Sequence, residues 1–166
     1  MDKIFESLNH YDIVTCLIPG IVFCQLIDWL YGTKFIEENT ITLMIISYVF
    51  GIIVSRIGSI IIEPLCKVSK IIVMADYEQW RKAASQCEEV KTLTTKSTVY
   101  RSWVALMLIQ IILLLIFPLS DFASNIGKCY LFFGQFIVLI LLILSYRKQI
   151  DYVCKRVNGV MSDITV

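Results

Sequence analysis

The sequence predicts an all-α polytopic membrane protein, with four transmembrane helices and a cytoplasmic layer formed by an amphipathic helix and a helical C-terminal tail. Three observations predict this fold class. Hydrophobic residues make up 57% of the chain and mean hydropathy is +0.74, well above the values of soluble domains. Residues 102–120 and 129–146 contain no charged side chain, and each stretch can cross the roughly 30 Å hydrocarbon core as a helix. Residues 13–31 and 41–65 are two further apolar stretches of spanning length.

The four spans leave no room for a separate globular domain, so we expect residues 1–166 to form a single membrane domain. Lys and Arg gather in the loop 66–101 and in the tail 147–166, whereas the connections on the opposite side hold only Lys34 and Lys128. Cytoplasmic loops collect Lys and Arg. The predicted location is therefore the cell inner (plasma) membrane, with both termini in the cytoplasm.

The first span follows a short segment, residues 1–12, whose apolar residues recur at helical spacing. These are Ile4, Phe5, Leu8 and Tyr11. The spacing predicts a helix lying at the inner membrane interface. Within the span, Pro19 removes a backbone hydrogen bond and predicts a kink. Asp28 lies beside Trp29 near the outer interface, where we expect its carboxylate to be hydrated.

The second span carries small residues at every fourth position. This small-residue ridge consists of Ser47, Gly51, Ser55 and Ser59, with Gly58 adjacent. In lipid, close backbone approach through small residues is what brings helices together. The ridge therefore predicts contact with another helix, which belongs either to the same chain or to a second copy, and we expect a homo-oligomer.

Arg56 interrupts the second span about two thirds of the way inward. Exposing it to acyl chains would cost at least about 2.5 kcal/mol. Two interpretations stay open: Arg56 is buried or faces a pore, with Glu63 or Gln110 as its partner, or its long side chain reaches the inner-leaflet headgroups.

Spans one, three and four each hold one glutamine. These are Gln25, Gln110 and Gln135. One polar side chain per span favours hydrogen bonds between helices. The alternative is a water-filled path lined by the three glutamines and Arg56.

Two apolar stripes predict the cytoplasmic layer. The first stripe comprises Val73, Tyr77, Trp80, Ala84 and Cys87, and the second comprises Ile150, Val153, Val157, Val160 and Ile164. Their 3–4 spacing is typical of amphipathic helices. We expect the stripes to pack on each other or between subunits, and the alternative is that either one docks a cytosolic protein. The polar segment 92–98 is predicted to be a turn leading back into the membrane.

Nothing in the sequence predicts an enzyme, a cofactor or a metal site. The single histidine, His10, has no evident nucleophile or orienting acid. The six cysteines are scattered without a CxxC pair, so no metal ligation or disulfide is expected. The basic residues follow from topology, and direct binding of nucleic acid is not expected. The expected partners are the bilayer, further copies of the chain and a cytosolic protein encoded nearby.

Several residues carry a resemblance in layout. They are Leu17-Ile18-Pro19-Gly20 in the first span, Arg56 in the second, Tyr77 and Trp80 in the middle helix, and Tyr100-Arg101-Ser102 at the start of the third span. Around these residues the chain resembles small four-span membrane proteins of bacterial anti-phage defence loci, such as the Kiwa membrane subunit and the membrane accessory proteins of RNA-targeting CRISPR loci. Some of the latter carry an Arg followed five residues later by a His, whereas here Met161 follows Arg156. A nuclease-like activity is therefore not implied.

What the resemblance implies is a membrane-embedded oligomer that senses infection or permeabilises the inner membrane together with a cytosolic protein. The leading hypothesis is accordingly a sensor or effector subunit that forms or gates a pore near Arg56. The alternatives are a small ion channel or transporter, and a membrane anchor without catalytic activity.

Overall fold

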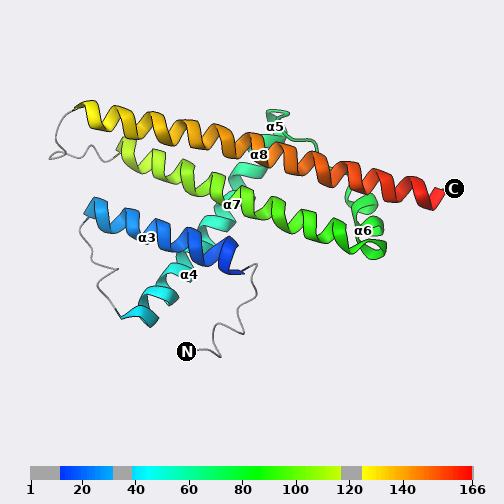
Figure 1. Cartoon of the computed structure of the whole chain (residues 1–166), viewed down its shortest axis with the longest axis horizontal. Helices are drawn as coiled ribbons and strands as arrows, with labels where there is room; N and C mark the ends of the chain where they lie inside the picture. Colours follow the sequence, from blue (N-terminus) through cyan, green and yellow to red (C-terminus); the bar gives the residue numbers. More distant parts are fainter. Residues whose placement is uncertain (1–11, 32–38, 117–124, 166) are drawn as a thin grey trace.

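The computed structural model describes residues 12–31, 39–116 and 125–165, with side chains for 12–29, 39–116 and 132–163. Every regular element in this part of the chain is a helix, as the all-α class predicts (Figure 1). The elements are η1 (Ile13–Leu17), α3 (Ile18–Tyr31), α4 (Thr40–Ile57), η3 (Gly58–Ile62), α5 (Glu63–Val68), α6 (Tyr77–Gln86), α7 (Glu88–Ile116) and α8 (Asn125–Thr165). The helix predicted for residues 1–12 lies almost wholly outside the described residues.

Two helices in the described part of the chain are long and apolar enough to cross a membrane. One runs Thr40–Val68 through α4, η3 and α5, and the other is α7; each has 29 residues. The first predicted span forms a shorter apolar helix, Ile13–Trp29, and part of the fourth, residues 129–131, has no described side chains. In the described residues, length and composition therefore identify two helices that could span a membrane rather than the predicted four.

Long helices α7 and α8 run side by side in opposite directions, and α3 lies along α7 on the other side (Figure 1). Helix α4 crosses this layer obliquely and contacts both α3 and α7. This arrangement brings both η1 and η3 against α7.

Each of the two prolines in the described residues follows a single turn of π-helix. The amide of Ile18 donates to the carbonyl of Ile13 just before Pro19, and the amide of Glu63 donates to that of Gly58 just before Pro64. A proline ring clashes with the carbonyl four residues earlier and cannot donate to it. Widening the preceding turn to i→i+5 bonding relieves that clash while the helix continues. The predicted kink at Pro19 is thus a π-turn.

Glycines allow the first two apolar helices to come into direct backbone contact. A Cβ added to Gly20 would lie 1.7 Å from the carbonyl oxygen of Ser47, and one added to Gly51 would lie 1.8 Å from the carbonyl oxygen of Cys16. At the crossing of the first two apolar helices, each helix therefore has a glycine in direct contact with the backbone of the other. Small-residue contacts of this kind are the usual way helices associate in lipid.

Two clusters of buried side chains hold the helices together. The larger one lies between α4, η3, α7 and α8 and includes Val54, Leu106 and Tyr146. The smaller one lies between α6, α7 and α8 and includes Ala83, Val90 and Val157. Because α7 and α8 contribute to both clusters, they connect the two ends of the molecule without a break.

The predicted turn at residues 92–98 is wrong, because these residues lie inside α7. The threonine hydroxyls bond to carbonyls one turn earlier: Thr94 donates to Val90 at 2.8 Å and Thr98 to Thr94 at 3.3 Å. The low helix propensity of threonine amounts to well under about 1 kcal/mol per residue. Burial of Val90 and Ser97 against the neighbouring helices outweighs it.

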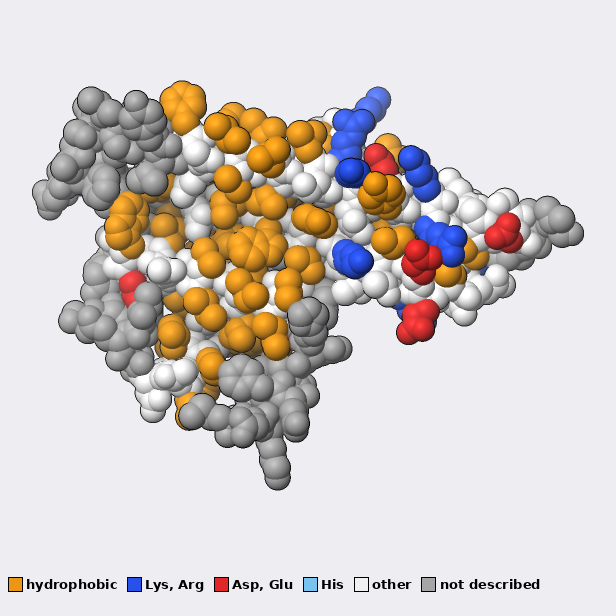
Figure 2. Space-filling model, in the orientation of Figure 1, with side chains coloured by type: hydrophobic (Ala, Val, Ile, Leu, Met, Phe, Trp, Pro, Cys, Tyr) orange, Lys and Arg blue, Asp and Glu red, His pale blue; other side chains and the backbone are white. Residues whose placement is uncertain are grey.

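Charged and apolar side chains separate along the molecule. In Figure 2 hydrophobic side chains cover the part of this face built from α3, α4 and the adjoining halves of α7 and α8. Lys, Arg, Asp and Glu gather at the other end, over α5, α6 and the last turns of α8. Large apolar side chains such as Ile45, Ile60 and Leu115 are 62–72% exposed, and exposed apolar side chains that cluster mark surfaces that contact a membrane or another protein.

Candidate functional site

An ion pair between Glu63 and Arg101 joins the two long apolar helices at the boundary between the apolar and charged ends of the molecule. The Glu63 carboxylate accepts hydrogen bonds from Arg101 Nη1 and, at 2.8 Å, from Lys67 Nζ one turn further along α5. The Glu63 and Arg101 side chains are 19% and 17% exposed. Largely buried pairs of this kind are costly to break, because the remaining charge loses its partner.

Gly58 explains why Arg101 comes so close to the second span. A Cβ at Gly58 would lie 3.2 Å from the Arg101 carbonyl oxygen and 3.4 Å from Ala105 Cβ. Beside this contact, the hydroxyl of Ser102 donates to that of Ser55 at 3.1 Å. Small residues thus let α7 approach α4 and η3 closely enough for the guanidinium to meet Glu63.

A cavity of about 380 Å³ lies against this ion pair on the side of the charged end. Its walls include Glu63, Arg101, the buried Tyr146 and, from the charged end, Trp80 and Cys154. The indole nitrogen of Trp80 donates to Thr94 at 3.0 Å, which fixes one wall of the cavity. The cavity therefore connects the spanning helices with the smaller cluster.

Arg56 lies in a second, more polar cavity of about 350 Å³ on the other side of Arg101. This cavity is lined by Asp12, Cys16, Tyr48, Ile52, Ser55, Arg56, Ser59, Thr98 and Arg101. Arg56 is exposed and forms no ion pair within the described part of the chain. Of its two predicted partners, Glu63 is engaged by Arg101 and Lys67 instead.

The structure does not gather the predicted intramembrane polar residues around one path. Gln25 is exposed and Gln110 is buried in α7. Gln135 on α8 has a buried side-chain oxygen that accepts no hydrogen bond from the described residues. Of the three cavities described here, one contains Arg56 and none contains any of these glutamines. Asp28 is half-buried near the end of α3 and has an interaction partner.

The small-residue ridge is occupied within the chain itself. Ser47 and Gly51 face η1 and α3, where the Ser47 hydroxyl also donates to the Cys24 sulfur at 3.6 Å. Ser55 and Gly58 face α7. Ser59 lines the polar cavity around Arg56. The sequence left open whether this ridge meets the same chain or a second copy, and the structure places its partners in the same chain.

The two apolar stripes meet in the smaller cluster. Trp80, Ala84, Val153 and Val157 pack there together, whereas Ile150 belongs to the larger cluster. Val73 and Tyr77 are 72% and 69% exposed, although the ring of Tyr77 stacks on Trp80. Val73 and Tyr77 are therefore the members of the first stripe that remain open to a partner.

Polar contacts reinforce the same layer. Gln149 Nε2 donates to the Leu93 carbonyl at 3.1 Å, and Arg156 pairs with Glu89 at 2.8 Å. The thiol of Cys154 donates to the Val73 carbonyl at 3.2 Å. Burial raises the pKa of the Cys154 thiol, and the nearby Asp151 carboxylate adds to this effect. The thiol therefore stays protonated at neutral pH.

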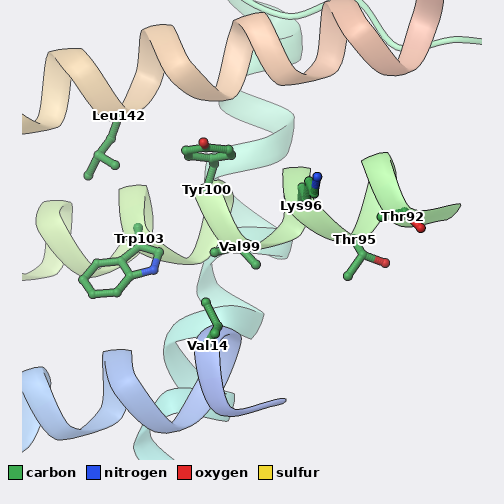
Figure 3. A pocket seen from close by; sticks show the side chains of 8 residues that line it. All are labelled: Val14, Thr92, Thr95, Lys96, Val99, Tyr100, Trp103 and Leu142. Carbon is green, nitrogen blue, oxygen red and sulfur yellow. The ribbon is translucent and has the colours of Figure 1, made fainter. Parts of the chain in front are cut away.

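A third, mostly apolar cavity of about 570 Å³ follows one face of α7 (Figure 3). Val14 points into it from η1 and Leu142 from α8, while α7 supplies Val99 and Trp103. Its polar lining comes from Thr92, Thr95 and Lys96, on the part of α7 nearest the charged end.

Arg101 is the central residue that sequence reasoning did not select as a site residue. Its signal was present, because Arg101 directly precedes the uncharged stretch of the third span and Glu63 lies near the inner end of the second. Opposite charges at the same end of adjacent antiparallel spans are natural partners. Within the described residues no group of three or more His, Cys, Asp or Glu side chains is placed to hold a metal ion.

Comparison with protein-family models, with curated proteins and with solved structures finds no match to this chain.

Proposed function

We propose that this chain is a sensor or effector subunit embedded in the inner membrane, which relays a signal between a cytoplasmic partner and the bilayer. In this proposal all four apolar stretches span the membrane and both termini lie in the cytoplasm. The anti-phage role implied by the resemblance is the cellular setting we propose.

The observation that carries the proposal is the continuity of α7 and α8. Helix α7 begins in the smaller cluster with Val90 and continues into the larger one with Leu106, a single rod of about 44 Å at 1.5 Å per residue. Helix α8 connects Val157 in the smaller cluster with Tyr146 in the larger one. Because both rods are uninterrupted, a displacement of the smaller cluster also moves the helices in the larger one.

Burial supports the placement in a bilayer. Only 28% of the most apolar window of Thr40–Val68 and 33% of that of α7 is buried within the chain. A core helix of a soluble protein would be mostly buried. The remaining apolar surface requires acyl chains or further copies of this chain, and since the small-residue ridge is occupied internally, self-association would use other apolar faces.

Exposed Val73 and Tyr77 are the surface we propose for the cytosolic partner, because they are apolar and lie beside the charged end of the molecule. Any pore would form between copies, since the described cavities do not bring Arg56 and the three glutamines together. This separates the proposal from a channel built by one chain acting alone.

The first test measures the mass of the detergent-solubilised particle, purified alone and with the products of the flanking genes. We expect an oligomer that retains a cytosolic partner, and we expect cells carrying the locus to resist phage. A strict monomer that retains no partner and passes ions in liposomes would contradict the proposal in favour of a channel or transporter.

The second test breaks the rod. The double substitution Thr95→Gly with Lys96→Gly, at exposed or half-buried positions of α7 between the clusters, costs about 2 kcal/mol of helix propensity relative to two alanines. We expect phage resistance to fall although the particle mass and the bound partner are unchanged. The matched Thr95→Ala, Lys96→Ala chain keeps the helix and should keep resistance. Equal phage resistance in the glycine and alanine variants would contradict signal relay through α7 and favour the alternative that the protein is a membrane anchor.

A further inference from the structure

Two arginines line the polar cavity. Arg56 comes from the second apolar helix and Arg101 from α7, so the cavity collects positive charge from segments 45 residues apart in the sequence. Arg56 forms no ion pair within the described part of the chain. Guanidinium groups that line one cavity are suited to recognise a carboxylate or phosphate.

Arg101 has unused hydrogen-bonding capacity in spite of its bond to Glu63. Its Nη1 donates to the Glu63 carboxylate, whereas its Nε is buried without an acceptor in the described residues. A buried guanidinium N–H without a partner is expensive. The buried Nε cannot be reached from the cavity, so an acceptor there would bond to one of the Nη N–H groups that Glu63 does not use.

Hydroxyl groups complete the donor set. Ser55 accepts a hydrogen bond from Ser102 and so keeps its own proton to donate, and Ser59 lines the same wall. Thr98 uses its proton on the Thr94 carbonyl. Asp12 is the one carboxylate that lines the cavity. Nearby, Glu63 pairs with both Lys67 and Arg101, so Arg56, Arg101 and Lys67 exceed the two carboxylates by one charge.

We propose that this cavity binds a phosphate group, held between Arg56 and Arg101 with Ser55 and Ser59 as further donors. Guanidinium and hydroxyl donors match the oxygens of phosphate in number and geometry. The group could belong to the headgroup of an anionic phospholipid of the inner leaflet or to a soluble phosphate. The lipid source rests on the membrane placement proposed above, whereas the phosphate chemistry rests on the side chains alone.

The test uses the full chain in neutral detergent and native mass spectrometry. Phosphatidylglycerol, phosphatidylcholine and inorganic phosphate are titrated separately. We expect phosphatidylglycerol or inorganic phosphate to bind in a stoichiometry of one per chain. Binding of phosphatidylglycerol identifies the source as lipid, and binding of inorganic phosphate alone identifies a soluble ligand and would leave the membrane proposal unaffected.

Substitutions at two arginines separate the site from general surface charge. Arg56→Gln should weaken binding about tenfold or more, because it removes charge-assisted hydrogen bonds, and Arg56→Lys should restore part of the loss. Arg147→Gln is the matched control, since Arg147 is exposed at the same end of the predicted spans and lines none of the described cavities.

Three outcomes would overturn the proposal. One is that neither phosphatidylglycerol nor inorganic phosphate binds. Another is that Arg147→Gln weakens binding as much as Arg56→Gln, which would show diffuse attraction to the positive end. The last is that phosphatidylcholine binds as well as phosphatidylglycerol and that Arg56→Gln weakens the binding of neither lipid. Thermal unfolding of each variant, unchanged from the parent chain, confirms that the fold is intact.

Discussion

Arg101 and Glu63 form an ion pair between two helices, 38 residues apart in the chain, with both side chains at least four-fifths buried. The pair lies where the spanning helices meet the charged end of the molecule. It therefore links the membrane-facing part, in our proposal, with the cytoplasmic layer.

Replacing Glu63 by Gln is expected to destabilise the chain by about 2 kcal/mol, because the largely buried Arg101 loses its counter-charge. Lys67→Gln is the control, since Lys67 is 46% exposed and exposed pairs contribute at most about 1 kcal/mol. The measurement is unfolding of the detergent-solubilised chain on titration with SDS. Equal effects of the two substitutions would show that the Arg101–Glu63 ion pair contributes no more to stability than the Lys67–Glu63 pair.

Gly51→Ala is expected to prevent the first two apolar helices from packing, because its new methyl group would lie 1.8 Å from the Cys16 carbonyl oxygen. Backbone atoms cannot move aside cheaply, so we expect a loss of about 3 kcal/mol or more. Gly159→Ala in α8 meets no atom within 4 Å and should stabilise the helix by up to about 1 kcal/mol. The same SDS titration compares the two, and a neutral Gly51→Ala would refute the close crossing.

Lys70→Gly is expected to stabilise the chain by about 0.5–1 kcal/mol. Lys70 has a φ of 55°, and its amide donates to Lys67 while that of Ile71 donates to Cys66. This pattern is a Schellman motif, which favours glycine at the left-handed position. Lys82→Gly, inside α6, should instead cost about 1 kcal/mol. Thermal unfolding of both variants checks the sign.

Cys154 is expected to react slowly with iodoacetamide, because burial raises its pKa above the ordinary 9.0 and the thiolate is the reactive form. In a chain that keeps only this cysteine, the alkylation rate at pH 8 should be several-fold lower than in the denatured chain.

The same pKa shift sets a pH dependence of stability. The folded state holds the Cys154 proton more tightly than the unfolded state does, so this contribution is fully present below pH 9 and is lost as pH rises through the folded pKa. Cys154→Ser should remove that alkaline loss. A reaction rate at pH 8 equal to that of the denatured chain would contradict the raised pKa of the half-buried Cys154 thiol.

Helix positions followed largely from the sequence, whereas side-chain partners did not. Apolar runs and the spacing of Trp80 and Ala84 identify helices because burial has a period of 3.6 residues. The segment 92–98 was wrongly predicted to be a turn. The unfavourable helix propensity of threonine is small, and its hydroxyl can bond to a carbonyl of its own helix. Propensity was overridden there by packing against α8.

Arg56 and Glu63 show why partners are harder to predict. Seven residues separate them, so they lie about 10 Å apart along the helix axis, and a π-turn between them alters their relative direction. Arg101 reaches Glu63 because α7 crosses the second apolar helix at Gly58. The position of this crossing cannot be predicted from the spacing of residues within either helix. The small-residue ridge predicted a close contact correctly, but only the three-dimensional arrangement identified its partners.

Membrane topology is the central claim, and cysteine labelling tests it most directly. In a chain whose own cysteines are replaced, single cysteines are placed at Lys34, Lys128, Lys91 and Lys155 and treated with a membrane-impermeant maleimide in cells with a permeable outer envelope. We predict labelling at Lys34 and Lys128 in intact inner membranes, and at Lys91 and Lys155 only after the membrane is opened. Labelling of Lys91 from outside, or recovery of the chain in the soluble fraction, would contradict the four-span arrangement.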